Sequence, residues 1–213
     1  MPIDVAEAAL RQVVRRLRIS HADLLVHPVV ADFLCPVALP SCVADAPHLG
    51  FFPGSTIGNL EPLQALRFLQ QVRHTLGGGA RLLVGVDLRK DAALLIPAYD
   101  DAAGITTAFN RNILTRLNRD AGADFDVSAF SHRVVWNEAE SRIEMHLVSD
   151  HAQAVRIAGR RIAFRAGETI HTENSYKWTI DDFRQLARRA GWLPRQVWTD
   201  PEDLFSIHLL EIE

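Results

Sequence analysis

The sequence predicts an α/β protein built around a parallel sheet of the doubly wound class. Short apolar runs alternate with amphipathic segments through the first 87 residues. One of these runs, ARLLVGVD at 80–87, is continuous enough for a strand that is buried on both faces. With 213 residues, of which 48% are hydrophobic and 23% charged, the chain can bury a sizeable core and is not mainly disordered.

The first part of the chain is expected to alternate strands with helices. The apolar spacing predicts helices over 6–18 and 61–76, the second with Asn59 as its N-cap and ended by Gly77. The expected strands are the end of one strand at 1–5, then 24–30, 49–53 and 80–87.

From residue 91 the pattern changes to two helices followed by short strands, with a further helix and two strands at the end. The helices are expected over 92–103, 106–119 and 179–190, the last capped by Thr179. The final strands are expected at 195–199 and 205–211. We therefore expect three parts: a sheet with helices at 1–90, an α+β insert at 91–178, and a return to the sheet at 179–213.

Composition excludes several classes of function. Only Lys90 and Lys177 are lysines among 23 basic residues, the arginines are scattered and the net charge is −3, so no nucleic-acid footprint is expected. No leader and no membrane-spanning run is visible, which favours a cytoplasmic protein with no membrane partner. The nine histidines show neither HExxH nor i,i+4 pairing, so no metal site is expected.

Local patterns leave two interpretations open at each candidate site. The loop at 51–59 lies at the carboxyl edge of the sheet, where ligands bind, but Asn59 is equally suited to a helix cap alone. Asp4 and Asp32 each end an expected strand at that edge, and either hold ribose hydroxyls or are solvated loop acids. Tyr99 by default packs against its own helix, and residues 172–175 form a polar loop that could also bind a ligand.

Read together, several segments resemble the histidine-specific S-adenosylmethionine-dependent methyltransferases, the histidine Nα-methyltransferases of ergothioneine biosynthesis. These segments are FFPGSTIGNLEP, GVDLRKD, AYDDAAGITTAFNRNIL, RIEMHLVS, GETIHTENSYKW and VWTDPEDLFSIHLL, in order from residue 3 to the C-terminus. The resemblance implies a class I methyltransferase-like (Rossmann-like) sheet with an inserted α+β substrate domain. It also implies three methyl transfers to the α-amine of L-histidine, which give trimethylhistidine (hercynine).

The resemblance further implies S-adenosyl-L-methionine as cofactor. Asp4 matches the acid that holds the ribose, and Asp32 with Phe33 matches the pair at the adenine. Gly54 is expected to approach the cofactor or the substrate backbone.

The expected substrate-binding residues match the family motifs one by one. Asn59 and Tyr99 match the residues that hold the amino and carboxylate groups, and they are also the candidate catalytic residues. Met145 is expected near the imidazole, and Glu173 and Ser175 match the pair that hydrogen-bonds its two nitrogens. Because both Glu173 and Ser175 are present, L-histidine is favoured as the substrate over a bulkier aromatic amine.

The family extends well before the position that matches Met1. By resemblance, the absent part holds a helical region, the first sheet strand and the glycine-rich acidic turn under the methionine. We therefore expect an N-terminally truncated sheet with an exposed edge. A second chain that supplies the strand is one expected partner. The alternative function is a catalytically silent remnant that binds a small amine or a protein partner.

Overall fold

The computed structural model describes residues 1–40, 43 and 46–212. Its main sheet has four strands in the order β10-β11-β4-β3: β3 (Leu49–Phe52), β4 (Arg81–Asp87), β10 (Leu193–Thr199) and β11 (Phe205–Glu211). Strands β3 and β4 are parallel, as predicted. Strand β11 departs from the predicted parallel sheet. It runs antiparallel to β10, to which a short connection joins it as a hairpin, and it is also antiparallel to β4.

Helices α2 (Pro62–Leu76) and α5 (Ile180–Arg189) cover one face of this sheet. They share a core with the inward side chains of β4 and β11, Leu82, Val84, Val86 and Leu210. Trp192 is 1% exposed and donates from its indole Nε1 to the carbonyl of Leu69 at 2.9 Å. No helix in the described part of the chain is long and apolar enough to cross a membrane.

The predicted N-cap of α2 is wrong. The cap is Glu61, whose side chain forms a reciprocal capping box with Gln64, and Pro62 occupies the first helical position. Asn59 instead ends the 3₁₀ turn η2 (Thr56–Asn59), and Leu60 after it is extended. The side chain of Asn59 is therefore available for another contact. By contrast, Thr179 caps α5 as expected, accepting from the Asp182 amide at 3.1 Å.

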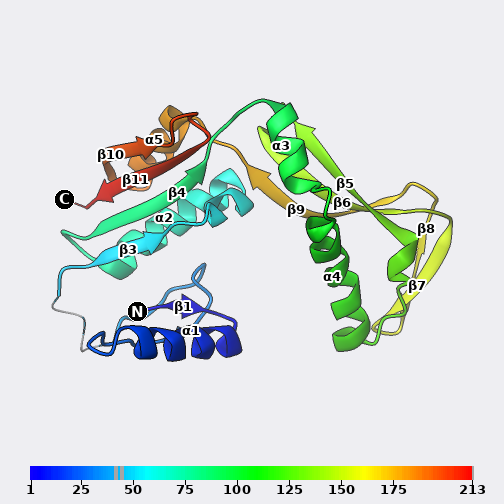
Figure 1. The fold of residues 1–213 in the computed structure, drawn as a ribbon, viewed down its shortest axis with the longest axis horizontal. Helices are drawn as coiled ribbons and strands as arrows, with labels where there is room; N and C mark the ends of the chain where they lie inside the picture. The colour runs from blue at the N-terminus through cyan, green and yellow to red at the C-terminus, as the bar shows by residue number, and fades with distance from the viewer. Residues whose placement is uncertain (41–42, 44–45, 213) are drawn as a thin grey trace.

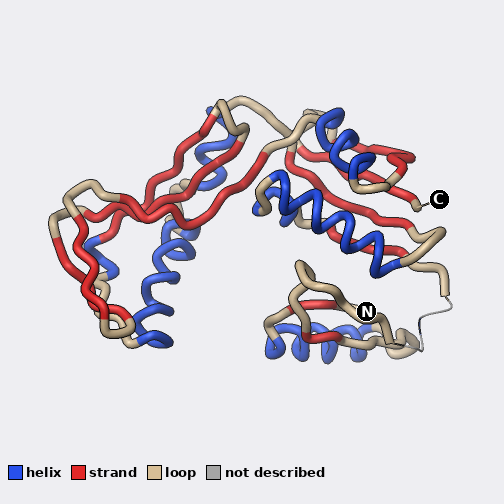
Figure 2. Tube along the Cα trace, turned by 180° about the vertical axis from the view of Figure 1, so that it is seen from behind, coloured by secondary structure: helices blue, strands red, loops and turns tan. Residues whose placement is uncertain are grey.

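The N-terminal unit consists of α1 (Glu7–Ser20) and a separate pair of parallel strands, β1 (Ile3–Asp4) and β2 (Val29–Val30). The strand expected over 24–30 is formed only by its last two residues. Figures 1 and 2 show this unit set off from the four-stranded sheet, on the side of β3. The ring of Phe33 links the two parts, since it lies 5.5 Å from the ring of Phe52 and 5.8 Å from that of Phe68.

Residues between β4 and α5 form the second lobe in Figure 1. Helices α3 (Ala92–Tyr99) and α4 (Ile105–Ala121), with the turn η3 (Val127–Ala129), pack on an antiparallel sheet ordered β5-β6-β9. Its strands are β5 (Phe130–Asn137), β6 (Arg142–Ser149) and β9 (Thr169–Tyr176), and a hairpin of β7 (Gln153–Ile157) and β8 (Arg160–Phe164) lies beside them. Residues 172–175 belong to β9 and are not a loop, because 173–175 pair with β6 and Thr172 lies at an irregularity within the pairing.

Strand β9 joins the two lobes. It contacts η2, and the chain that follows it pairs with the end of β4 through a bridge between Leu88 and Trp178. At the contact with η2, a Cβ added to Gly58 would lie 2.9 Å from the carbonyl oxygen of Tyr176. The bridge thus holds the end of β9 against the carboxyl end of β4. The lack of a side chain at Gly58 allows η2 to approach the end of β9 closely.

We predict that stability falls as the pH drops from about 6.5 to about 4 because of His208. This side chain is 0% exposed on β11, and burial lowers its pKa to about 4. The unfolded chain binds a proton over this range that the folded chain does not, so the loss reaches about 3 kcal/mol. Urea unfolding at pH 7 and pH 4.5 measures it. His208→Leu removes the titrating group and should flatten the dependence; equal pH slopes in both proteins would contradict the assignment.

We predict that Gly58→Ala destabilises the junction between the lobes. The new methyl group meets a backbone carbonyl, which cannot rotate away as a side chain could, so η2 or β9 must shift. Overpacking of this kind costs about 1–3 kcal/mol. Thermal unfolding measures the change. Gly78→Ala is the matched control, because its Cβ meets nothing within 4 Å; identical melting temperatures for the two variants would rule out a tight junction.

Candidate functional site

Two polar side chains meet where η2 faces β9. The amide Nδ2 of Asn59 donates to Oε1 of Glu173 at 2.8 Å. Burial raises the pKa of the Glu173 carboxyl, and the hydrogen bond from Asn59 works against that shift. An amide and a carboxylate that are 114 residues apart in sequence therefore form one polar pair between the lobes.

A second pair lies next to the first along β9. The hydroxyl of Tyr99, the last residue of α3, lies 2.8 Å from that of Ser175. Glu173 and Ser175 are two residues apart in a strand, so they point to the same face with about 7 Å between them. Met145, 4% exposed, pairs with Glu173 across the sheet. The structure thus brings together all five residues expected to bind substrate.

Sequence reasoning missed two residues of this cluster, Lys177 and Asp87. The side chain of Lys177 is 0% exposed, and its Nζ donates to Asp87 Oδ2 at 2.6 Å. It also donates to the hydroxyls of Tyr99 at 2.6 Å and Ser175 at 2.8 Å. A signal was present, because Glu173, Ser175 and Lys177 alternate in the motif ENSYK and alternation is the period of a strand.

The loop that follows β3 is fastened to the end of β4. Ser55 has a left-handed backbone, with φ of 54°, and its hydroxyl accepts from the amide of Asp87 at 2.9 Å. The loop crosses β4 so closely that a Cβ on Gly85 would lie 1.9 Å from the carbonyl oxygen of Pro53. Gly54 is exposed, and a Cβ there would meet only the Thr56 hydroxyl at 3.7 Å. Space alone therefore does not require glycine at position 54.

Three of the four predicted cofactor residues, Asp4, Asp32 and Phe33, lie in the N-terminal unit, whereas Gly54 follows β3. Asp4 ends β1, Asp32 follows β2, and these strands are parallel, so both exposed carboxyl groups lie at the same end of this pair. The pair is a sheet separate from that of β3 and β4, so the single edge shared with the loop at 51–59 that the sequence predicts is replaced by two. Each carboxylate accepts one amide hydrogen bond through Oδ1, from Ala6 at 2.7 Å and from Leu34 at 2.9 Å. Further acceptor lone pairs remain on each group, which is chemistry that suits ribose hydroxyls. The ring of Phe33 is largely engaged with Phe52 and Phe68.

A third polar cluster lies on the opposite face of the β5-β6-β9 sheet. Glu144, His146 and His171 have ligand-type atoms within 4.8 Å of one another. Burial opposes ionisation of Glu144, but hydrogen bonds from Asn137, Arg142 and His146 together lower its pKa to about 2. Because three donors already engage this carboxylate, we interpret the cluster as a network that ties β6 to β5.

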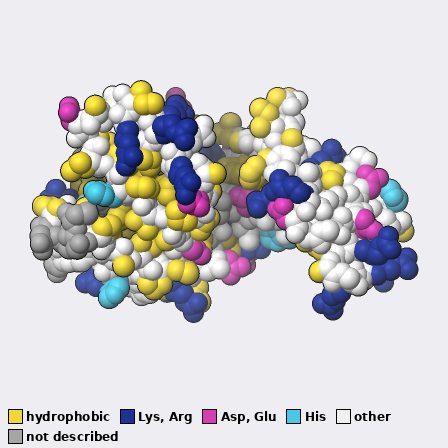
Figure 3. Space-filling view, turned by 90° about the horizontal axis from the view of Figure 1, so that it is seen from below, with side chains coloured by type: hydrophobic (Ala, Val, Ile, Leu, Met, Phe, Trp, Pro, Cys, Tyr) yellow, Lys and Arg dark blue, Asp and Glu magenta, His cyan; other side chains and the backbone are white. Residues whose placement is uncertain are grey.

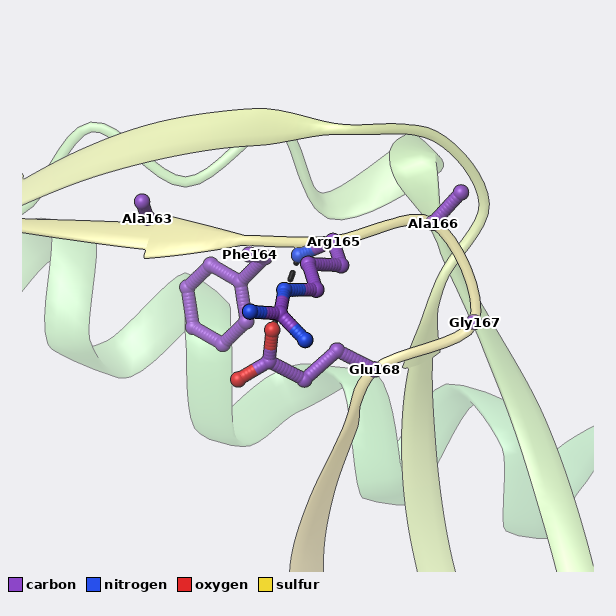
Figure 4. Close-up of a pocket in the computed structure, with 6 residues that line it drawn as sticks. All are labelled: Ala163, Phe164, Arg165, Ala166, Gly167 and Glu168. Atoms are coloured by element: carbon purple, nitrogen blue, oxygen red, sulfur yellow. Dashed lines mark hydrogen bonds between the residues drawn. The ribbon is translucent and has the colours of Figure 1, made fainter.

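Two pockets are not lined by the Asn59–Glu173 or Tyr99–Ser175 pairs, although Lys177 is among the residues that line the smaller one. The larger, of about 640 Å³, is lined by one continuous segment, Ala163–Glu168, where β8 turns toward β9. Figure 4 shows Glu168 turned back toward Arg165, whose amide it binds at 2.8 Å. The smaller, of about 310 Å³, lies between the ends of α2, α5 and β9. Neither contains Asn59 or Glu173, so the candidate site is defined by converging side chains.

Known proteins resemble this chain over almost its whole length. Residues 1–212 match the family model described as histidine-specific methyltransferase, SAM-dependent. The chain is 40% identical to the histidine N-alpha-methyltransferase of Mycolicibacterium smegmatis and 38% identical to that of Mycobacterium tuberculosis. Each alignment covers 98% of this chain but 65% of the relative, so the chain spans just under two thirds of their length.

Solved structures share the fold. An S-adenosylmethionine-dependent methyltransferase from Clostridium acetobutylicum matches 99% of the chain and 73% of its own, with a TM-score of 0.53 and 8% identity. The CcbJ methyltransferase from Streptomyces caelestis matches 99% of the chain and 78% of its own, with a TM-score of 0.50 and 12% identity. The architecture is that of class I methyltransferases, and the chain belongs to the family of histidine-specific, S-adenosylmethionine-dependent methyltransferases.

Proposed function

We propose that the protein methylates the α-amino group of L-histidine with S-adenosyl-L-methionine, toward trimethylhistidine in ergothioneine biosynthesis. The observation that carries this proposal is the convergence of Asn59, Tyr99, Glu173 and Ser175 from three separate elements. Family membership and the names of the two mycobacterial relatives support the same reaction.

Recognition of histidine would depend on the alternation of side chains along β9, which places Glu173 and Ser175 on the same face. Glu173 would accept the imidazole N–H, and Ser175 would donate to the other ring nitrogen, while Met145 packs beside the ring. Asn59 donates one hydrogen bond to Oε1 of Glu173, and the carboxylate keeps further lone pairs that an imidazole N–H can use. A ligand without the N–H would leave a partly buried carboxylate with one partner fewer, which penalises such analogues.

Catalysis would consist mainly of positioning. The bound cofactor supplies an electrophilic methyl group, and the amine must present a neutral lone pair in line with it. Asn59 and Tyr99 would hold the amino-acid end of the substrate and aim that lone pair. Well-oriented reactants can gain about 7–11 kcal/mol relative to free encounter. The amine proton would leave to water or through the Tyr99 hydroxyl.

The cofactor would lie across the carboxyl ends of the parallel strands. Asp4 would hold the ribose, Asp32 and Phe33 would contact the adenine, and Gly54 would face the cofactor or substrate backbone. The ring of Phe33 would contact the adenine while it also packs on the rings of Phe52 and Phe68. Residues 91–178 would act as the substrate domain, and 1–90 with 179–213 as the methyltransferase sheet, in a cytoplasmic enzyme.

Open strand edges favour a second candidate role, in which a partner chain completes the sheet. In the described part of the chain, β3 pairs only with β4 and β1 only with β2. Phe51 on β3 is 68% exposed and Val5 after β1 is 64% exposed. Figure 3, viewed from the side of α1, shows exposed hydrophobic side chains among basic ones on that lobe. A strand from a second chain would bury such edges, and without it the chain would be a silent amine-binding remnant.

We predict that Glu173→Ala weakens histidine binding by more than about tenfold while S-adenosylhomocysteine binding is unchanged. The variant loses a charge-assisted hydrogen bond to the imidazole, whose net contribution is about 1.5–3 kcal/mol. Isothermal titration calorimetry measures both ligands. The control is Glu140→Ala, an exposed glutamate at the turn between β5 and β6. Unchanged histidine affinity in Glu173→Ala would remove this residue from the site.

Titration of S-adenosylhomocysteine into the 213-residue chain tests the cofactor site. We expect micromolar binding that tightens when L-histidine is present, because the two ligands share one site. Asp4→Ala and Asp32→Ala should each weaken it, whereas Asp23→Ala in the loop after α1 should not. A chain that unfolds cooperatively but binds neither ligand would favour the remnant over the enzyme.

A further inference from the structure

Lys177 is a buried cation without a role in the proposed recognition of histidine. Its side chain is 0% exposed, whereas that of the other lysine, Lys90, is 16% exposed. Burying an ammonium group is costly unless each of its protons is hydrogen-bonded and a counter-charge lies nearby. Asp87 supplies the counter-charge, with Oδ2 at 2.6 Å from Lys177 and Oδ1 at 2.6 Å from Lys90.

Counting the hydrogen bonds of Lys177 shows what it does to its neighbours. An ammonium group has three protons and no acceptor, and the three contacts of Lys177 use all of them. Two of the three go to the hydroxyl oxygens of Tyr99 and Ser175, so both oxygens act as acceptors toward the lysine. Neither hydroxyl can donate its own proton to Lys177, because an ammonium group has no acceptor.

The same count leaves one proton free. Tyr99 and Ser175 carry two hydroxyl protons, and the 2.8 Å contact between their oxygens uses one of them. Neither hydroxyl donates to the carboxylate of Asp87, whose Oδ2 and Oδ1 accept from Lys177 and Lys90. The second hydroxyl proton therefore has no acceptor among these groups and can be donated to a ligand.

We infer that Lys177 is a positioning residue: it makes both hydroxyl oxygens acceptors, and with Tyr99 as the donor to Ser175 the remaining proton is that of Ser175, which donates it to an unprotonated ring nitrogen of the substrate. The inference deepens the proposed function and rests on it. Lys177 sets the specificity of the site for a ring that carries both an N–H and a bare nitrogen, with Glu173 accepting the N–H. It touches no reacting atom.

Removal of the ammonium group redirects the hydroxyl protons. In Lys177→Met the carboxylate of Asp87 loses one partner, and a hydroxyl proton of Tyr99 or Ser175 is the donor that can replace it. The proton that Ser175 would give to the ring is then drawn toward β4. The variant thus loses the preference for a ring with an acceptor nitrogen, beyond any general loss of affinity.

The test compares two ligands by calorimetry: L-histidine, and a pyrrolylalanine whose ring keeps one N–H but lacks the second nitrogen. Wild-type protein should prefer histidine by about tenfold to a hundredfold, the value of one hydrogen bond to a partly buried acceptor. Lys177→Met should lose most of that preference, as should Ser175→Ala. Lys90→Met is the matched control, since it removes only the lysine on Oδ1, leaves Lys177 on Oδ2 and on both hydroxyls, and should keep the preference.

The outcomes separate this inference from the function on which it rests. If the wild-type chain binds neither ligand, the proposed function is wrong, and the positioning role of Lys177 is then wrong as well. If histidine binds and Lys177→Met weakens both ligands equally, the function stands and the positioning role is wrong. A purely structural lysine would give that result, because a general distortion does not distinguish the two rings.

A measurement without ligand checks the network itself. With only two lysines, protein labelled with ¹⁵N-lysine gives two Nζ signals in NMR, and Lys90→Met assigns them. The Lys177 signal should show slow proton exchange and should shift in both Tyr99→Phe and Ser175→Ala. Rapid exchange, or a signal that neither variant moves, would overturn the inference whatever the ligands do.

Discussion

The contact between Lys177 and Asp87 is the interaction on which the arrangement of the two lobes depends. Asp87 is the last residue of β4 in the main sheet, and Lys177 directly follows β9 in the second lobe. Their charged groups are 2.6 Å apart, with the lysine side chain wholly inaccessible to water. Loss of Asp87 would leave the buried ammonium group without its counter-charge, whereas loss of Lys177 would leave Asp87 with Lys90 alone, so the chain is constrained to keep both lobes in this relation.

That constraint explains why the candidate site forms at the junction. The ammonium group that joins β9 to β4 also binds the hydroxyls of Tyr99 and Ser175. One buried cation thereby holds the end of α3, the end of β9 and the end of β4 together. The contacts that assemble the fold here are the same ones that orient the groups facing a ligand, and changes to them affect stability and recognition together.

Strand geometry provides the rest of the site. The side chains of Glu173 and Ser175 in β9, and of Lys177 directly after it, follow one another with the period of two that extended backbone imposes. Asn59 completes the set because Glu61 and Pro62 begin α2, which leaves the Asn59 amide free to reach Glu173. A helix cap at Asn59, as local sequence signals suggest, would have consumed the side chain that instead spans the two lobes.

The sequence by itself determined the α/β class, most helix positions, the cap at Thr179 and, through long motifs, the family. These depend on local signals, namely apolar periodicity, capping side chains and fixed strings of residues, which are all present in one dimension. It could not determine that residues 172–175 lie in a strand, that Asn59 reaches Glu173, or that Lys177 is buried against Asp87. The contacts of Asn59 with Glu173 and of Lys177 with Asp87 join residues 90 or more positions apart, and the strand at 172–175 depends on pairing with β6. Only the tertiary structure decides which distant polar groups become neighbours and neutralise one another.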